Sequence, residues 1–524
     1  MKPFFLFLLI AVFPFPVSAQ LGFSLTPASQ APRIVTLDSP SPLLQIKVMV
    51  KAGSAQDPAG LEGLAQLTGN LLIQGSFGEE KSPVTKERLA ELSRPWGGGA
   101  YPTVSVSKEA TVFSFVVPRP VLEEYVEKVI GPMFNRPLFD AKELDRVRAE
   151  TLQGLRSALR FERIEMLGLL TLDNVIHEGT SYAHPQMTEK GLEAVDREAL
   201  RRFYAAHYRP ENLIVGVSSM DKAVADNLSA AFKPAPQEVQ PFSWRPAPPP
   251  LPARGRSVLI VAMPNAISTG LHGAAPLSVS RRDKDFWPLY VGNLWLGAHR
   301  DDFARLYQLI REERGYNYGD YSYVEHFEGR PEYLFQPPNT PRRHQYFSLW
   351  LRPVAHAHAA HVLRAAVYEV SEFLRAGLSE EQCARSKNKA RSLYLGIADS
   401  AEKVLAWKLD DAYYGMAPGY LDSYLKSVGA VTCPEINAAL RAHIRTEGMR
   451  FVVVTSSEAA AGIAAQVADE GPVFGKGAQD YQMEDKEPIL KRDALWANTR
   501  LGIAKDRIRI VPAGKMFETG DLPK

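Results

Sequence analysis

Cysteine is scarce in this sequence, which contains only Cys383 and Cys433 among its 524 residues. At most one disulfide can therefore form within the chain. The sequence leaves two alternatives open, one disulfide or two unlinked cysteines, because it cannot show whether the two Cα atoms come within bonding range. An exported chain would reach an oxidising compartment, where a disulfide persists.

The sequence also lacks an excess of charge of one sign. Lys and Arg total 61 against 59 Asp and Glu, so the formal net charge at pH 7 is +2. This balance predicts neither a nucleic-acid binder nor a polyanionic surface. Any recognition by charge must depend on a local group of residues.

Long hydrophobic runs are absent after the N-terminus, so we expect no membrane-spanning segment in the rest of the chain. The N-terminus reads MKPFFLFLLIAVFPFPVSAQ, with a positive charge at Lys2, an apolar run and small residues at Val17-Ser18-Ala19. These features predict a secretory signal peptide over residues 1–19. An uncleaved anchor is the alternative, but the apolar run is shorter than the roughly 20 residues that cross a bilayer. We therefore expect a soluble, exported protein without a membrane anchor.

A proline-rich segment divides the chain. Residues 234–252 read PAPQEVQPFSWRPAPPPLP, with eight prolines in nineteen residues and no hydrophobic periodicity. This composition is typical of a semi-extended linker. It separates two stretches of comparable length, 20–233 and 253–524, and a hydrophobic content of 45% is enough to bury sizeable cores.

The order of elements expected from the hydrophobic pattern is similar in the two stretches. Each begins with a β-rich run, continues with a long helical segment and then returns to a strand. The corresponding segments are 43–50 with 257–262, 141–159 with 379–395, and 212–217 with 449–454. The spacing lacks the tight βαβ alternation of a parallel sheet. We therefore predict an α+β fold of two similar sandwich domains, in which helices pack on mainly antiparallel sheets.

The most informative segment runs from Val50 to Ser76. It reads Val50-Lys-Ala-Gly-Ser54, followed by Gly63-Leu-Ala-Gln-Leu-Thr-Gly-Asn-Leu-Leu-Ile-Gln-Gly-Ser76. This pattern resembles the signature of the pitrilysin/insulinase (inverzincin) peptidases, in which a strand ending in Gly-Ser leads to a helix that carries G-x-A-H-x-x-E-H. In that family the two histidines share one helix face and bind zinc, and the glutamate activates the metal-bound water.

The zinc-binding residues of that family are replaced in this sequence. Aligning the two patterns places Gln66 and Asn70 at the histidine positions and Gly69 at the glutamate position. Amide oxygens suit zinc much less well than imidazole nitrogens do, and glycine offers no general base. The family's third ligand corresponds to Glu150, which is either a relic ligand or a solvated helix carboxylate. We therefore expect neither a metal nor a catalytic residue in this chain.

The resemblance extends over nearly the whole chain after the signal peptide. Residues 194–200 and 208–213 are similar to segments near the end of the family's first domain, and residues 377–382 and 431–435 to two helix starts of its second. The segment Ala304-Arg-Leu-Tyr-Gln-Leu-Ile-Arg-Glu-Glu-Arg-Gly-Tyr-Asn-Tyr318 is similar to the family's S-R-L-x-x-x-L-R-E-x-R-G-L-x-Y. The resemblance implies two LuxS/metallohydrolase-like α/β-sandwich domains, one on each side of the linker.

The resemblance also implies two substrate-binding residues. In two-subunit members of the family, one subunit carries the zinc helix, and its partner carries an arginine and a tyrosine that face the cleft. The matching residues are Arg311 and Tyr318. An arginine can hold a substrate carbonyl or carboxylate with two parallel hydrogen bonds, and a tyrosine hydroxyl can support an oxyanion. The alternative is an ordinary helix-surface charge and a strand aromatic.

A glycine-rich loop precedes a predicted edge strand. Residues Pro95-Trp-Gly-Gly-Gly-Ala-Tyr101 lead to an alternating apolar stretch from Val104 to Val117. In the family, an extended peptide adds as an extra strand along the corresponding edge, so Gly99 and Ala100 are candidate substrate-binding residues. Three glycines permit close approach of another backbone, or they form only a flexible turn.

Two other segments are weaker candidates for a site. Three histidines, His356, His358 and His361, lie where a helix is expected to begin, and the last two would share one helix face as a metal pair. No Asp, Glu or Cys completes such a site before Glu369, so we expect a solvated helix start instead. The polar stretch 324–343 is either an insertion that shapes the cleft or a plain surface loop.

Together the resemblance and the predicted signal peptide imply a non-catalytic, substrate-binding subunit of a heterodimeric zinc peptidase that degrades or processes peptides in a bacterial periplasm. Zinc is expected in the partner, a homologous subunit with an intact H-x-x-E-H box. The alternative is a non-enzymatic peptide-binding or scaffold protein derived from a peptidase. The retained Arg311 and Tyr318 favour the first hypothesis, because a scaffold has no need of cleft chemistry. An active single-chain peptidase would need a replacement metal site, and the sequence offers none that is convincing.

Overall fold

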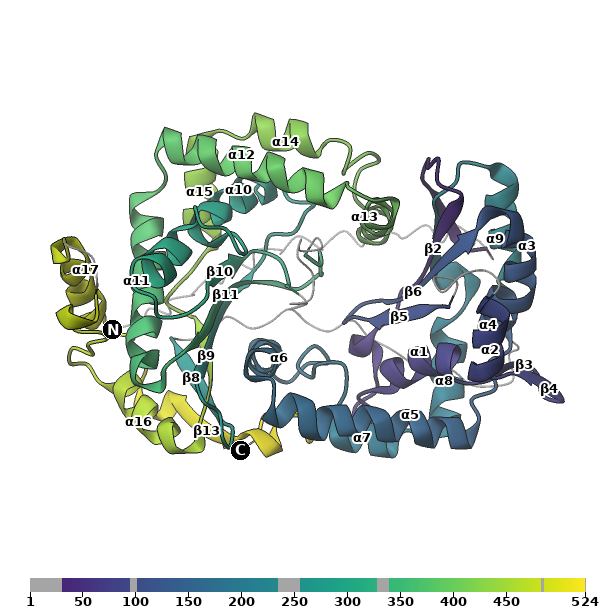
Figure 1. Ribbon diagram of the computed structural model, residues 1–524, viewed down its shortest axis with the longest axis horizontal. Coiled ribbons are helices and arrows are strands. Elements are labelled where there is room, and N and C mark those ends of the chain that lie inside the picture. Colours follow the sequence, from purple (N-terminus) through teal and green to yellow (C-terminus); the bar gives the residue numbers. More distant parts are fainter. Residues whose placement is uncertain (1–30, 95–100, 234–254, 328–338, 482–484, 524) are drawn as a thin grey trace, which may run out of the picture.

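The structure is a computed structural model of the chain, and it describes residues 31–94, 101–233, 255–327, 339–481 and 485–523. The predicted signal peptide and the predicted linker lie outside the described residues. Figure 1 shows one sheet with its helices in purple and blue, and a second sheet with its helices in teal, green and yellow. The strands of the first sheet come from residues 33–217, and those of the second from residues 257–512.

Within the described residues, the first sheet has the strand order β1-β7-β2-β6-β5. β1 runs parallel to β7, and the other neighbours are antiparallel. The strands are β1 (Arg33–Thr36), β2 (Leu43–Val50), β5 (Thr103–Val106), β6 (Thr111–Pro118) and β7 (Leu213–Val217), and a separate hairpin contains β3 (Phe77–Glu79) and β4 (Ser82–Val84). Residues of β6 alternate between buried and half-buried, because successive side chains of a strand point to opposite faces.

Helices cover one face of this sheet over a core that includes Leu67, Phe113 and Phe115. Two of the longer helices begin at an acidic side chain that accepts backbone N–H groups, Asp140 before α5 and Asp196 before α8. The helices of the first half are α1 (Leu64–Gln74), α2 (Lys86–Ser93), α3 (Leu122–Tyr125), α4 (Gly131–Asn135), α5 (Ala141–Gln153), α6 (Ile164–Ile176), α7 (Glu189–Ala194), α8 (Arg197–His207) and α9 (Lys222–Ala231). A π-helical segment, Gly154–Leu159, directly follows α5.

The second sheet has the order β10-β11-β9-β12-β8-β13 among the described residues. β8 runs parallel to β12 and β13, and the other neighbours are antiparallel. Its strands are β8 (Ser257–Ala262), β9 (Thr269–Leu277), β10 (Asp320–Tyr323), β11 (Gln345–Val354), β12 (Arg450–Thr455) and β13 (Ile508–Pro512). Its helices are α10 (Phe286–Gly297), α11 (Ala359–Ala376), α12 (Glu380–Ile397), α13 (Ala401–Tyr414), α14 (Tyr424–Ala430), α15 (Cys433–His443), α16 (Ser457–Ala468) and α17 (Glu487–Ala497). The predicted α+β fold of two helix-covered, mainly antiparallel sheets is confirmed.

Each half contributes one helix to the sheet of the other half. α6 packs on β9 and β12 of the second sheet, whereas α13 packs on β7, β2 and β1 of the first (Figure 1). Two glycines permit this close packing. A Cβ on Gly168 of α6 would lie 2.3 Å from Nε2 of His272, and a Cβ on Gly216 of β7 would lie 2.3 Å from Cδ1 of Leu409. The two halves are therefore joined through packed helix–sheet contacts in both directions.

A buried polar cluster also joins the halves. The Asp173 carboxylate on α6 accepts hydrogen bonds from Arg342 Nη1 at 3.1 Å and from the Tyr346 hydroxyl at 2.9 Å. Glu109, between β5 and β6, accepts one from the Tyr414 hydroxyl of α13 at 2.7 Å. Exposure is 4% or less for Asp173, Arg342 and Glu109. Removing one partner of such a buried pair leaves an uncompensated charge, so the cluster favours one placement of the two halves.

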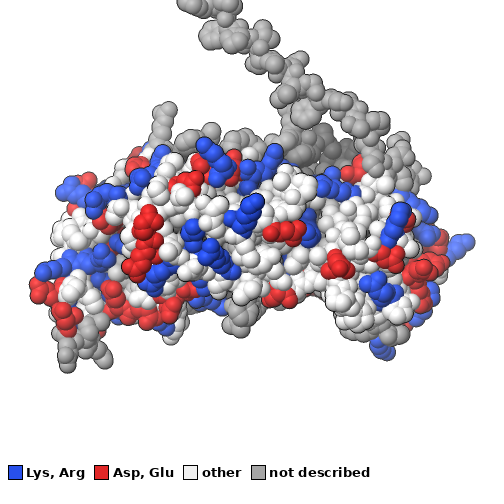
Figure 2. Space-filling model, turned by 90° about the horizontal axis from the view of Figure 1, so that it is seen from above, with Lys and Arg blue, Asp and Glu red and all other residues white. Residues whose placement is uncertain are grey.

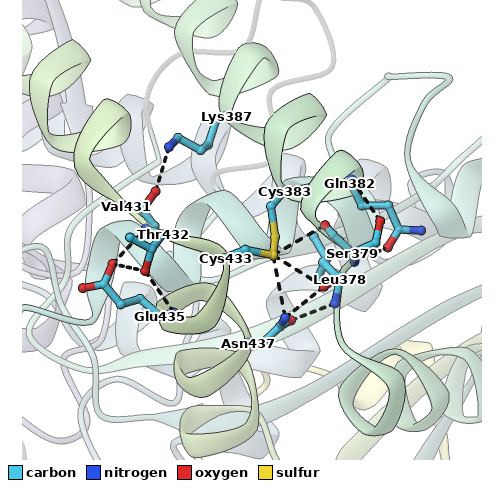
Figure 3. Close-up of a disulfide and its surroundings, with 10 residues drawn as sticks. All are labelled: Leu378, Ser379, Gln382, Cys383, Lys387, Val431, Thr432, Cys433, Glu435 and Asn437. Atoms are coloured by element: carbon cyan, nitrogen blue, oxygen red, sulfur yellow. Dashed lines mark hydrogen bonds between the residues drawn. A yellow bond between two sulfur atoms is a disulfide. The ribbon is translucent and has the colours of Figure 1, made fainter.

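A disulfide joins Cys383 and Cys433, whose Cα atoms are 5.6 Å apart. Figure 3 shows that the bridge connects the beginnings of α12 and α15. A capping residue precedes each of these helices, since Ser379 accepts the backbone N–H of Gln382 and Thr432 accepts that of Glu435. Of the two alternatives that the sequence left open, the structure supports the bridge.

The charged surface agrees with the balanced composition. Figure 2 shows Lys and Arg intermingled with Asp and Glu over the visible face, without a broad area of one sign. Among the described residues, no helix is long and apolar enough to cross a membrane.

Candidate functional site

The helix that corresponds to the zinc box is well formed. Gly63, with φ of 118°, lies at the N-cap of α1, and its left-handed conformation suits a residue without Cβ. The Asp57 carboxylate accepts the backbone N–H groups of Gly63 at 2.8 Å and Ala65 at 2.7 Å. The replaced zinc-box residues therefore lie on an intact, capped helix and not on a disrupted one.

The two amides at the histidine positions bond to each other. Gln66 Nε2 donates to Asn70 Oδ1 at 3.2 Å, one helical turn away, and both side chains are half-buried. Gly69 is buried, and a Cβ at that position would lie 3.2 to 3.3 Å from methyl groups of Val104, Val106 and Thr111. The strands β5 and β6 thus closely cover the position where the family carries its general base.

Glu150, the candidate third ligand, lies on α5, which packs beside α1. Its carboxylate pairs with Arg146 at 3.1 Å, and its side chain is 57% exposed. Arg146 also donates to the backbone oxygen of Gln74 at 2.8 Å, which links α5 to the end of α1. Two amides and one exposed, ion-paired carboxylate do not fit zinc, which is held by imidazole, thiolate and carboxylate ligands. Across the described ranges, no group of three or more His, Cys, Asp or Glu residues is placed to hold a metal ion.

The arginine and tyrosine of the second motif flank a turn beside the edge strand β10. Arg311 lies in a π-helical segment, Tyr307–Glu312, with its guanidinium 5.1 Å from the centre of the Tyr307 ring and paired with Glu312. Its side chain is 35% exposed. Tyr318 follows the turn and is 79% exposed, an unusual position for a large aromatic residue. Both side chains are therefore accessible to a ligand.

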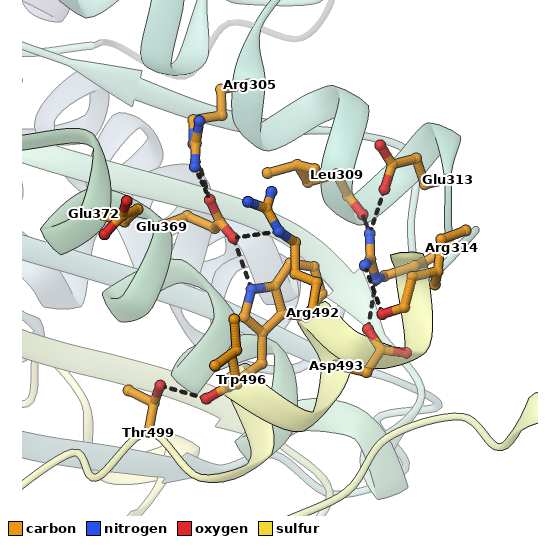
Figure 4. A network of polar contacts seen from close by, with 12 residues as sticks. Arg305, Leu309, Glu313, Arg314, Glu369, Glu372, Arg492, Asp493, Trp496 and Thr499 are labelled. Carbon is orange, nitrogen blue, oxygen red and sulfur yellow. Dashed lines mark hydrogen bonds and ion pairs between the residues drawn. The ribbon is translucent and has the colours of Figure 1, made fainter. Parts of the chain in front are cut away.

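A buried network holds the segment that carries Arg311, as Figure 4 shows. Arg314 Nε donates to Asp493 Oδ1 at 2.7 Å, and its guanidinium lies 4.1 Å from the centre of the Trp496 ring. The Trp496 indole donates to Glu369 at 2.7 Å, and Glu369 also pairs with Arg305 at 2.6 Å. The sequence predicted no contact among these residues. The available signal was a second arginine, Arg314, in the same motif as Arg311.

The predicted edge strand is shorter than expected. The apolar stretch from Val104 to Val117 forms a hairpin of β5 and β6, because Ser107 N–H and the Ala110 carbonyl close a turn at 2.8 Å. The prediction of one continuous strand is therefore wrong. β5 is the edge strand, and Gly99 and Ala100, which precede it, lie outside the described residues.

The histidine segment also differs from its prediction. His356 and His358 form a short 3-10 turn, and His361 lies in the first turn of α11. His361 is fully buried, with Nδ1 2.9 Å from the backbone oxygen of Val473, and His356 Nδ1 lies 2.8 Å from the Thr269 hydroxyl. The prediction of a solvated helix start is wrong for His361, because the loop that contains Val473 packs over it. The polar stretch 324–343 includes residues 328–338, which lie outside the described ranges.

Comparisons with known proteins agree with these features. A family model described as Insulinase (Peptidase family M16) matches residues 33–163, and one described as Peptidase M16 inactive domain matches residues 194–390. An uncharacterized zinc protease of Streptomyces coelicolor is 32% identical over 147 residues, a match that covers 26% of this chain and 30% of that protein.

Solved structures share the fold. The peptidase M16 inactive domain from Pseudomonas fluorescens has a TM-score of 0.70 and 20% identity, over 82% of this chain and 97% of that chain. A protease from Helicobacter pylori has a TM-score of 0.64 and 12% identity, over 80% and 96%. The two family models together match more than half of the sequence. The chain therefore belongs to the insulinase/pitrilysin peptidase family, M16.

Proposed function

We propose that this chain is the non-catalytic, substrate-binding subunit of a two-chain zinc peptidase. The observation that carries the proposal is the contrast between its two motifs. At the zinc-box positions the chain has a Gln66–Asn70 amide pair and a closely covered Gly69. In the second motif it keeps Arg311 and Tyr318 accessible beside β10. The partner would supply the H-x-x-E-H helix and the zinc.

Arg311 and Tyr318 would act on bound substrate. The planar guanidinium of Arg311 can donate two parallel hydrogen bonds to a carbonyl or carboxylate of the peptide. The phenolic hydroxyl of Tyr318 can donate to the oxygen on which negative charge develops when a peptide carbonyl is attacked. The network of Arg314, Asp493 and Trp496 supports this role, because a fixed backbone lowers the cost of holding both groups in a productive geometry.

The edge strand β5 offers a place for the peptide backbone. An extended peptide can add to an exposed sheet edge through main-chain hydrogen bonds, while pockets along the edge select side chains. We assign Gly99 and Ala100, which precede β5 in the sequence, to this peptide-binding edge.

The proposed compartment is the periplasm. The predicted signal peptide over residues 1–19 supports export, and the Cys383–Cys433 disulfide agrees with an oxidising environment.

The second candidate function is a non-enzymatic peptide-binding or scaffold protein. The ion pair between Arg311 and Glu312 favours it, because this contact already engages the guanidinium within the chain. The two functions differ in what happens to turnover by the complex when Arg311 or Tyr318 is changed.

The test is peptide cleavage by this chain reconstituted with a zinc-bearing homologue from the same organism. Under the proposal, Arg311→Ala and Tyr318→Phe leave assembly intact and each lower turnover by about 100- to 1000-fold, the usual loss for one donor to a developing oxyanion. Assembly is measured separately by size-exclusion chromatography. Arg500→Ala is the matched control, because Arg500 is also a surface arginine paired with a glutamate. Equal turnover of wild type and both variants would instead support the scaffold function.

A further inference from the structure

The second half contains a cavity of about 610 Å³ that the proposed function does not use. It lies between α10, α12 and the edge strand β10. α10 packs against both α12 and β10, and Figure 1 shows α10 and β10 below α12. Its volume is within the range of about 300–1,000 Å³ that is typical of small-ligand sites. Neither Arg311 nor Tyr318 lines it.

Aromatic rings form much of its wall. Trp287 and Tyr424 meet edge to face, with ring centres 4.9 Å apart, and Tyr290 and Trp407 lie beside Tyr424. Tyr323 and Phe327 line the side of the cavity near β10 and stack at 4.5 Å. Such walls favour a ligand with a planar ring, which gains both apolar burial and ring–ring contacts.

The charged groups of the wall largely neutralise one another. Arg281 donates Nε and Nη2 to the two oxygens of Glu325 at 2.8 and 3.1 Å, and both side chains are at most 5% exposed. Two other charged side chains of the wall also have partners, since Lys389 pairs with Asp301 and Asp399 pairs with Lys403. A charged ligand would therefore meet charges that are already paired within the chain. It would also lose its hydration, so the cavity favours an uncharged ligand.

Three buried polar atoms of the wall lack a hydrogen-bond partner within the described part of the chain, Arg281 Nη1, His299 Nε2 and Trp407 Nε1. Arg281 Nη1 can only donate, so it calls for an acceptor such as a carbonyl oxygen. The other ring nitrogen of His299 lies 2.6 Å from the Tyr323 hydroxyl. Burial, with smaller effects of Arg300 and Arg352, lowers the pKa of His299 to about 3, so its imidazole is neutral at physiological pH.

We propose that this cavity binds a neutral ligand that joins an aromatic ring to an amide. The aromatic wall would hold the ring, and the unpartnered N–H of Arg281 would donate to the amide oxygen. Either a free small molecule or an aromatic residue of a peptide has this chemistry. The proposal is independent of the two-chain peptidase, because binding is measured on the single chain without a partner or turnover.

A glycine in the cavity wall offers a position at which a larger side chain would block ligand binding. Gly396 on α12 lines the cavity, and a Cβ built on it meets no heavy atom within 4 Å. Gly396→Phe therefore adds an aromatic ring at the cavity wall without a clash at its Cβ. Gly462 on α16 is the matched control, because it is an exposed helical glycine whose Cβ also meets open space and which does not line the cavity.

The experiment titrates N-acetyl-L-phenylalaninamide into the full chain and follows binding by saturation-transfer NMR and calorimetry. Wild type and Gly462→Phe should bind it saturably, and Gly396→Phe should lose this binding. N-acetyl-L-alaninamide should bind at least about tenfold more weakly, because it lacks the ring that the wall would bury. If Gly396→Phe fails to fold, Ser392→Phe, one turn earlier on α12 and also in the wall, provides the same block.

Three results would overturn the proposal: no saturable binding by wild type, unchanged binding by the folded Gly396→Phe variant, or equal affinity for the alanine analogue. A blocked nonapeptide of Gly and Ser with one central Phe distinguishes the two sources. If the chain binds this peptide more tightly than N-acetyl-L-phenylalaninamide, and Gly396→Phe abolishes that binding, the ligand is an aromatic residue of a peptide. If the chain binds N-acetyl-L-phenylalaninamide but not the peptide, the ligand is a free small molecule.

Discussion

Removing the Cys383–Cys433 disulfide should destabilise the protein mainly through its unfolded state. The bridge closes a segment with a sequence separation of 50 residues. Both cysteines are buried, at 2% and 6% exposure, and alanine keeps the Cβ of each residue while it removes one sulfur atom. The capping residues Ser379 and Thr432 begin α12 and α15 without help from the bridge. The double variant Cys383→Ala/Cys433→Ala is therefore expected to keep the native fold.

The magnitude follows from the length of the closed segment. Cross-linking an unfolded chain over this separation removes conformational entropy worth about 4 kcal/mol at 25 °C. The free energy of unfolding of the second half should fall by roughly that amount in the double variant. Wild type treated with a reductant should lose a similar amount, because reduction opens the same segment.

The assay is urea unfolding of oxidised wild type, reduced wild type and the double variant, followed by circular dichroism and tryptophan fluorescence. Titration of free thiols in denaturant establishes whether the bridge is closed in each sample. Two free thiols in non-reduced protein from an oxidising compartment would refute the disulfide. A closed bridge with a stability difference below about 1 kcal/mol would refute the entropic reasoning.

Three further predictions concern the contact between the halves, acid stability and metal binding. Gly168→Ala should destabilise the protein by about 1–3 kcal/mol, because the new Cβ would overlap the His272 ring. The control Gly462→Ala should not destabilise it, because its Cβ meets open space. Equal melting temperatures of the two variants would contradict the close packing of α6. Burial lowers the pKa of His272 to about 3, below the unfolded value of about 6.5, so its contribution to stability is present above pH 6.5 and is lost as pH falls toward 3. Lowering the pH from 7 to 5.5 should therefore reduce the free energy of unfolding by about 1.3 kcal/mol through His272. His272→Leu should remove this part of the pH dependence in urea unfolding, and the same pH dependence in both proteins would show that His272 does not titrate as expected. The purified chain should bind no stoichiometric zinc and cleave no peptide, whereas Gln66→His/Gly69→Glu/Asn70→His should take up one zinc if Glu150 supplies the third ligand. A folded triple variant that stays metal-free by elemental analysis would exclude Glu150 from that role.

Local sequence determined where several elements begin and end. The strands expected at residues 43–50 and 257–262 are found over the same residues, because runs of apolar and β-branched residues favour buried strands. The helix expected from Ser379 begins there, because the Ser379 hydroxyl and the Gln382 side chain form a reciprocal cap. Sequence also identified the family and the replaced zinc box, since both are properties of residue type at a fixed spacing.

The tertiary structure decided which distant residues meet. Cys383 and Cys433 come within 5.6 Å only because α12 and α15 pack side by side. His361 is buried because the distant residue Val473 lies over it, which no local pattern indicates. Arg311 and Arg314 are both arginines and lie three positions apart. Only Arg314 is buried, because it packs against Asp493 and Trp496.

The exchange of helices between the halves is the largest feature that sequence did not reveal. The hydrophobic periodicity of α6 and α13 shows that each helix needs an apolar partner, but periodicity does not specify which sheet provides it. That choice depends on two glycines, Gly168 and Gly216, that are distant in sequence from the side chains they admit. Local sequence fixes the conformation of each segment through short-range contacts, whereas the pairing of segments depends on shape and charge complementarity that exists only in the folded chain.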